Sequence, residues 1–232
     1  MNLPSSMTQA ILGAMAQYYY IEIDGMVYLV EEGGRLRFPR SLEELNFEIE
    51  IEHPMAVEGQ EVLFSKPLIA YYPQGKGWWH KDRIPLLDEA DPIVRRAINL
   101  SLPRVVAEGV IIKGGEILLV KAKRGYLKDT WNLPGGFVTY GESPAQAVAR
   151  EVGEEVGVRC RAGRLLGVES FIGKKSFNHW HMFFYKAELL DGEFHPAADE
   201  IAEVRWFPLK EAVELIESPV MRRKVREIFL RP

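Results

Sequence analysis

The chain has 232 residues, of which 47% are hydrophobic, and this is enough for one large domain or two small ones with packed cores. Its 29 basic and 33 acidic side chains give a formal net charge of -4, and no segment concentrates the positive charge, which argues against nucleic acid as a partner. Cys160 is the only cysteine, which excludes an intrachain disulfide and a thiolate cluster and is typical of a protein in a reducing cytoplasm.

The first half of the chain is predicted to consist mainly of β-strands. Its N-terminal stretch, MNLPSSMTQAILGAMAQYYYIEIDG, lacks a basic start and a long apolar run, so we expect neither secretion nor membrane insertion. Between Tyr18 and about Leu68 the runs IEIDGMVYLV, RLRFP, FEIEIE and EVLFSKPLI are typical of strands, with a turn at Glu31–Gly34. The polar and aromatic run from Tyr71 to Arg83 is predicted to be a loop. Asp91 and the proline after it then predict a helix that ends before Pro103.

A second unit is predicted to begin near Arg104. The runs VVAEGVIIKGGEILLVKAK, WNLPGGFV, RLLGVESFI, HWHMFFYKAEL and AEVRWFPL are typical of strands, and LKEAVELIES and PVMRRKVREIFL are typical of helices. Strands and helices in this order predict an α/β fold with a mixed sheet that is covered by helices on both faces. We place the boundary at residues 100–105. This gives a β-rich domain of unknown role at residues 1–104, ending in one helix, and a second domain at residues 105–232.

Residues 136–158, GFVTYGESPAQAVAREVGEEVGV, contain a well-specified helix. Ser143 can cap its N-terminus, the proline that follows suits the first helical position, and Gln146 completes a capping box. Gly157 is expected to end the helix with a positive φ angle. The helix is therefore predicted over about Ser143–Val156.

Three glutamates share one face of this predicted helix. Residues three and four apart are neighbours on a helix, so Glu151, Glu154 and Glu155 are gathered together and not spread around the cylinder. Repulsion between adjacent carboxylates costs about 0.2–0.5 kcal/mol per pair, and a compensating cation is therefore inferred. Hard oxygen ligands favour Mg²⁺ or Mn²⁺, and Mg²⁺ commonly bridges to substrate phosphates, which indicates a diphosphate substrate. Taken alone, such charge pairs more often form a solvated helix face.

The full pattern resembles the Nudix box, G-x5-E-x7-R-E-U-x-E-E-x-G-U, in which U is an aliphatic residue. Every fixed position is filled, by Gly136, Glu142, Arg150, Glu151, Glu154, Glu155 and Gly157, with Val152 and Val158 at the aliphatic places. The resemblance implies a Nudix α/β/α sandwich and a hydrolase that needs Mg²⁺, with Mn²⁺ as an alternative metal, to cleave a pyrophosphate bond. It also implies a homodimer.

The resemblance further implies a role for each polar residue of the box. The implied metal ligands are Gly136, Glu151, Glu154 and Glu155. Glu142 is then part of the outer metal shell, and Arg150 is expected to orient the carboxylates through an ion pair. The resemblance leaves the general base open between Glu154, Glu155 and Glu200. Glu200, which belongs to an acidic pair before the final predicted strand, could instead be an extra metal ligand. An exposed turn is the alternative interpretation of that pair.

Four residues are weaker candidates for contacts with the substrate. Trp131, Phe137 and Trp206 could stack on a nucleobase, although aromatic residues at such positions are more often part of the core. Lys174 could contact a phosphate, or it could belong to an exposed hairpin turn.

The expected substrate is a nucleoside diphosphate linked to another moiety, in the class of ADP-ribose, sugar nucleotides, dinucleotides or nucleoside triphosphates. Subfamily marks are missing: the run S-Q-P-W-P-F-P of NADH pyrophosphatases does not follow the box, and Lys174 stands where ADP-ribose and dinucleoside-polyphosphate enzymes carry a proline or a tyrosine. The alternative is a ligand-binding or regulatory Nudix module without turnover. A sensor would not need all three glutamates, because activated water matters only for the transition state.

Overall fold

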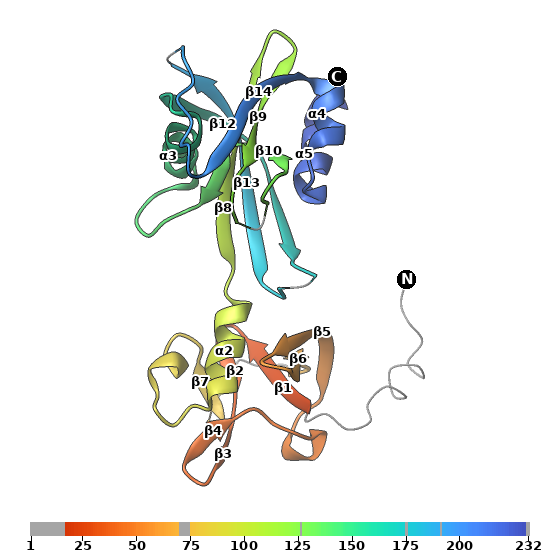
Figure 1. Ribbon diagram of the computed structural model, residues 1–232. Coiled ribbons are helices and arrows are strands. Elements are labelled where there is room, and N and C mark those ends of the chain that lie inside the picture. Colours follow the sequence, from red (N-terminus) through yellow and green to blue (C-terminus); the bar gives the residue numbers. More distant parts are fainter. Residues whose placement is uncertain (1–16, 70–74, 126, 175, 191, 231–232) are drawn as a thin grey trace. The chain divides into compact units, whose positions relative to one another are not determined.

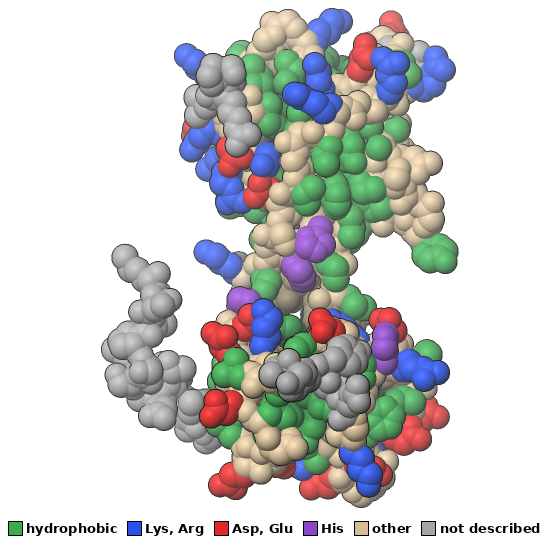
Figure 2. Space-filling model, turned by 180° about the vertical axis from the view of Figure 1, so that it is seen from behind, with side chains coloured by type: hydrophobic (Ala, Val, Ile, Leu, Met, Phe, Trp, Pro, Cys, Tyr) green, Lys and Arg blue, Asp and Glu red, His purple; other side chains and the backbone are tan. Residues whose placement is uncertain are grey.

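The computed structural model describes residues 17–69, 75–125, 127–174, 176–190 and 192–230, and it divides into two compact units (Figure 1). The first unit is Met1–Leu102 with Lys174–Asn178, and the second is Pro103–Gly173 with His179–Pro232. On the face drawn in Figure 2, acidic and basic side chains are interspersed over each unit. Within the described ranges, no helix has the length and apolar character needed to cross a membrane.

The first unit is built around a sheet of five strands in the order β5-β6-β1-β2-β7. Its elements are β1 (Gln17–Ile23), β2 (Met26–Tyr28), β3 (Val30–Glu32), β4 (Arg35–Arg37), the 3-10 helix η1 (Leu42–Glu44), β5 (Ile49–Val57), β6 (Gln60–Pro67), β7 (Trp78–His80), the 3-10 helix η2 (Ile84–Leu86) and α2 (Pro92–Ser101). Strands β1 and β6 are parallel, and the other neighbours in this sheet are antiparallel. The predicted β-rich character of this region is confirmed.

One detail predicted for this unit is wrong. Trp78–His80, predicted as part of a loop, forms β7 because its backbone pairs with Met26–Tyr28 of β2, a partner that lies far away in the sequence. Residues 71–74 of the same predicted loop lie outside the described residues. Asp91 occupies the N-cap position of α2 but makes no side-chain cap. Its carboxylate instead accepts a hydrogen bond from Arg35 Nε at 2.9 Å.

The second unit contains a mixed sheet of seven strands. Its elements are β8 (Arg104–Lys113), β9 (Glu116–Ala122), β10 (Trp131–Asn132), β11 (Gly135–Phe137), α3 (Pro144–Val156), β12 (Cys160–Ile172), β13 (His179–Leu189), β14 (Ile201–Pro208), α4 (Leu209–Leu215) and α5 (Pro219–Leu230). Strand β13 runs parallel to β8 and antiparallel to β12.

Strands β8 and β9 separate soon after the turn that joins them. Their ladder pairs Ile112–Lys113 with Glu116–Ile117. Beyond it, β11 pairs with β8 through Gly135–Phe137, while β10 and β14 pair with β9. The glycine-rich strand β11 is therefore placed at the edge of β8 where β8 and β9 have separated.

The two faces of this sheet carry separate hydrophobic cores, because side chains alternate along β8. Val106 and Val110 belong to a core that also contains residues of α4 and α5. Ala107 and Ile111 belong to the core on the other face, where the valines of α3 are fully buried and each stabilises the fold by about 1.5–3 kcal/mol. Figure 1 shows α3 on one side of the sheet and α4 and α5 on the other. The predicted mixed sheet between helical layers is confirmed.

Both ends of α3 are fixed as predicted. Ser143 accepts a hydrogen bond from Gln146 N, and the Gln146 side chain accepts one from Ser143 N, which completes the capping box. Gly157 ends the helix with φ 78°. A Cβ atom on Gly157 would lie 2.0 Å from the carbonyl oxygen of His195, so a glycine is needed both for the angle and for the close approach of that segment.

Candidate active site

Helix α3 and strand β11 bring two glutamates against two consecutive glycines. The N–H group of Gly135 donates a hydrogen bond to Glu155 Oε2 at 2.9 Å. A Cβ atom on Gly136 would lie 2.5 Å from Glu151 Oε1, so a larger residue there would displace the carboxylate of Glu151. The glycines therefore allow the acidic face of α3 to lie directly on β11.

Arg150 links the carboxylates of three glutamates into one network. Its Nη1 donates to Glu151 Oε1 at 2.8 Å and to Glu154 Oε2 at 2.9 Å. Its Nη2 and Nε donate to both oxygens of Glu142, at 2.7 and 3.2 Å. The same Nη2 donates to the carbonyl oxygen of Phe137 at 2.8 Å, which joins α3 to the end of β11. Hydrogen bonds from Arg150 lower the pKa of Glu142 to about 2.

The pKa values of two other carboxyl groups at this site are raised. Burial, together with the charges of Glu151 and Glu200, raises the pKa of Glu155 to about 8, although the hydrogen bond from Gly135 opposes the rise. Burial also raises the pKa of Glu151, although Arg150 opposes the effect. The site therefore gathers more carboxyl groups than Arg150 can pair, and burial disfavours the charged form of the unpaired ones.

A further acidic residue, Glu108 of β8, was not among the predicted site residues. Its side chain is 3% exposed, and its pKa is raised well above the usual value by burial and then by the charges of Glu155 and Glu151. The signal for it in the sequence was a single carboxylate inside the apolar run VVAEGVII. A strand prediction gives no reason to connect this residue with a helix that begins thirty-six residues later in the chain, at Pro144.

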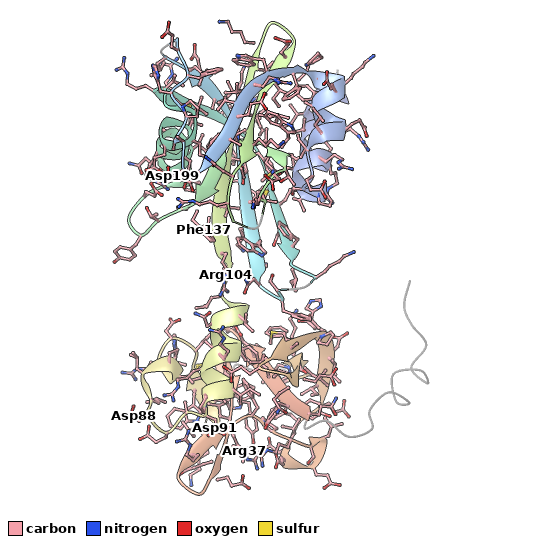
Figure 3. All side chains as sticks on the ribbon, in the orientation of Figure 1. Arg37, Asp88, Asp91, Arg104, Phe137 and Asp199 are labelled. Carbon is pink, nitrogen blue, oxygen red and sulfur yellow. The ribbon has the colours of Figure 1, made fainter. Side chains whose placement is uncertain are left out.

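Glu200 lies close enough to the site for its charge to raise the pKa of both Glu151 and Glu155. Its side chain is 44% exposed and approaches Arg124 Nη2 at 3.3 Å. Its backbone carbonyl accepts a hydrogen bond from Lys123 N at 2.7 Å, which holds the segment before β14 next to the end of β9. In Figure 3 the neighbouring Asp199 is drawn on the left of the second unit, and Phe137 lies below it.

The four weaker candidates occupy different environments. Trp131 packs on Phe207 with ring centroids 4.8 Å apart and borders the core next to α4 and α5. Trp206 borders the opposite core, next to α3. Phe137 is 54% exposed and directly follows the two glycines, whereas Lys174 is exposed in the turn after β12 and groups with the first unit. Phe137 is thus the aromatic candidate that the structure connects to Arg150.

The carboxylates do not form a closed metal site in the arrangement described. No three Asp, Glu, His or Cys side chains within the described ranges converge closely enough to hold a metal ion, and a cation would have to compete with Arg150 for Glu151 and Glu154. The chemistry of the donors nevertheless fits a hard divalent cation, because all of them are carboxylate oxygens. Glu108 Oε2 is also buried without a hydrogen-bond partner in the described part of the chain.

Comparison with known families decides the identity of the second unit. The family model of the NUDIX domain matches residues 103–228, which is more than half of the 232 residues and includes the whole glutamate-bearing helix. The chain belongs to the Nudix family. The resemblance inferred from the Nudix box is therefore confirmed, and α3 is the Nudix helix.

Individual Nudix relatives match the same half of the chain. The ADP-ribose pyrophosphatase of Methanocaldococcus jannaschii is 35% identical over 113 residues, which are 49% of this chain and 66% of that protein. The NAD-capped RNA hydrolase NudC of Pseudomonas aeruginosa is 32% identical over 121 residues, which are 52% of this chain and 42% of NudC. The chain therefore spans less than two thirds of either relative. The crystal structure of a MutT Nudix hydrolase from Burkholderia pseudomallei is 31% identical, with a TM-score of 0.47 over 55% of this chain and 99% of that one.

Proposed function

We propose that the second unit is a Mg²⁺-dependent pyrophosphohydrolase that cleaves a nucleoside diphosphate linked to another moiety. The observation that carries the proposal is the excess of carboxylates around Gly135 and Gly136, which Arg150 balances only in part. Glu151, Glu154, Glu155 and the carbonyl group of Gly136 would hold the cation. When bound there, a divalent cation neutralises charge on the diphosphate and makes water more acidic.

The protein's own residues supply positioning and a proton acceptor. Arg150 fixes Glu142, Glu151 and Glu154 relative to β11, and the N–H group of Gly135 fixes Glu155. The accessible carboxylates of Glu154 and Glu200, whose side chains are 56% and 44% exposed, can accept the proton of the attacking water. A new phosphorus–oxygen bond forms, the bridging phosphorus–oxygen bond breaks, and two phosphate monoesters are released.

The relatives narrow the substrate class. One is named for ADP-ribose and another for NAD-capped RNA, and both of these compounds contain an adenosine diphosphate joined to a second moiety. We therefore place ADP-ribose and NAD⁺ first among the substrates to be tested. The exposed ring of Phe137, which follows the glycines, is assigned to the nucleobase.

To test the proposal, the protein is incubated with a panel of diphosphate compounds in the presence and absence of Mg²⁺, and the released products are measured by chromatography. The panel contains ADP-ribose, NAD⁺, sugar nucleotides, dinucleoside polyphosphates and nucleoside triphosphates. We expect release of a nucleoside monophosphate from at least one diphosphate compound, and only with Mg²⁺. Binding of these compounds without turnover would contradict the proposal and favour a ligand-binding module.

A further inference from the structure

Glu108 stands out among the acidic residues because its burial has no evident structural purpose. It interrupts the buried apolar run of β8, its side chain is 3% exposed, and its Oε2 atom has no hydrogen-bond partner within the described ranges. Burying a carboxyl oxygen without a hydrogen-bond partner destabilises the fold, because the lost contact with water is not replaced. A residue retained at that cost is expected to interact with something that binds.

The backbone geometry shows where this carboxylate lies. Glu108 is opposite Gly135 in the ladder between β8 and β11. On either side of this pair, Gly109 N donates to the carbonyl oxygen of Pro134, and Val138 N donates to that of Val105. Glu108 and Gly135 are therefore a non-hydrogen-bonded pair, in which the two side-chain positions come closest together.

Gly135 consequently connects two carboxylates. Its N–H group points away from β8 and donates to Glu155 Oε2 at 2.9 Å, while a Cβ atom on Gly135 would lie 2.6 Å from Glu108 Oε2. The missing side chain thus leaves room for Glu108 beside the peptide group that holds Glu155. The adjacent Gly136 makes room for Glu151 on the opposite face of β11, and the two Cα atoms are only about 3.8 Å apart.

We propose that Glu108 supplies an additional carboxylate to the divalent-cation site, from β8 on the other side of the glycine pair. The proposal rests on the function proposed above for the helix glutamates. Neither Glu108 nor Glu155 forms an ion pair with a basic side chain in the part of the chain that the structure describes, whereas Glu151 shares Arg150. A bound cation would compensate both, which explains why a partnerless acid is tolerated inside the strand.

Direct titration with Mn²⁺, followed by the electron paramagnetic resonance of the free ion, tests the assignment independently of activity. The full chain is compared with Glu108→Gln and with Glu116→Gln, a matched change at an exposed position of β9. We expect the dissociation constant for Mn²⁺ to rise at least about tenfold in Glu108→Gln and to stay within about twofold of the wild-type value in Glu116→Gln. An unchanged dissociation constant in folded Glu108→Gln would overturn the assignment.

A second variant guards against misfolding of Glu108→Gln. Glu108→Asp keeps the charge but withdraws the carboxylate by one methylene group, so weaker Mn²⁺ binding is expected again, and wild-type affinity in a folded Glu108→Asp protein would also overturn the assignment. Failure of the proposed function has a different outcome: the wild-type protein would then bind no Mn²⁺ and cleave no diphosphate. If the wild-type protein binds and cleaves while Glu108→Gln binds equally well, the role of Glu108 alone is wrong.

Discussion

Arg37 in the first unit and Arg150 in the second each gather glutamates, but the two networks differ in their balance of charge. Arg37 donates to Glu32 at 2.8 Å and to Glu44 at 2.9 Å, and its side chain is 7% exposed. A second arginine, Arg40, approaches Glu32 at 3.7 Å. Hydrogen bonds from Arg37 are the main reason why the pKa values of Glu32 and Glu44 are both lowered. This network has as many cations as anions.

Around Arg150 the anions outnumber the cation. Glu142, Glu151 and Glu154 share it, and burial raises the pKa values of Glu155 and Glu108, which lie on either side of Gly135. A network in which every carboxylate has a basic partner stabilises a fold without a ligand. A network with more carboxylates than basic side chains leaves carboxylates that a cationic ligand can bind. From this difference we infer that the first network is structural and that the second is the one that binds the proposed cation.

The largest expected effect comes from removing charge at the second network. The double variant Glu154→Gln, Glu155→Gln should lower kcat by at least about a hundredfold, because lost metal ligands affect chemistry more than packing. Steady-state kinetics at saturating Mg²⁺ measure the loss, and circular dichroism checks the fold. Glu211→Gln, in the first turn of α4, is the matched control and should keep wild-type kcat. A fully active double variant would refute the metal assignment.

Replacing Arg37 or Arg150 with methionine should affect stability differently in the two networks. Arg37→Met should lower the free energy of unfolding of the first unit by about 2–3 kcal/mol, because Arg37 is buried and leaves two glutamates unpaired. Arg150→Met should cost about 1 kcal/mol or less, since its side chain is 30% exposed, but it should abolish most activity. Urea unfolding is monitored through hydrogen exchange of the amides of β1 and α3, so each loss of stability can be assigned to one of the two units. Equal stability losses would contradict the contrast.

Addition of Mg²⁺ should stabilise the second unit alone. At about a hundredfold excess over the dissociation constant, binding adds about 2.7 kcal/mol to the stability of the unit that binds. Hydrogen exchange should therefore slow in α3 and β11 and remain unchanged in β1 and β6. If Mg²⁺ slowed hydrogen exchange in both units, or in neither, the claim that only the network of the second unit binds a cation would be wrong.

Acidification should have the smallest effect and should act through the first network. The pKa values of Glu32 and Glu44 are lowered in the folded chain, so their contribution to stability is complete above the ordinary value of about 4.3 and is lost as the pH falls through the folded values. Protection of β1 amides should therefore decrease below about pH 4.3. Arg37→Met should show a flatter dependence, and Arg40→Met should resemble the wild-type protein. An identical slope in Arg37→Met would show that Arg37 does not lower these pKa values.

Features that depend on local sequence were predictable here, and features that depend on distant contacts were not. The capping box of Ser143 and Gln146 and the left-handed Gly157 define α3 within a short segment, so the helix was predicted correctly. Strand β7 was missed because its pairing with β2 joins segments far apart in the chain. Glu108 was missed for the same reason, since its relation to Glu155 exists only through the β8–β11 ladder. The Nudix box predicts which polar residues belong to the site. Their neighbours depend on the separation of β8 and β9, which lets β11 pair with β8.

The central claim is that the unbalanced carboxylates around Gly135 and Gly136 hydrolyse a diphosphate with the help of Mg²⁺. Phosphorus NMR of ADP-ribose and NAD⁺ with the wild-type protein, recorded before and after addition of Mg²⁺ to the same sample, tests it most directly. We predict that the diphosphate resonances persist without Mg²⁺ and are replaced by phosphate monoester resonances after its addition, for at least one of the two compounds. Unchanged diphosphate resonances for both compounds, in a sample whose protein binds Mg²⁺, would contradict the claim.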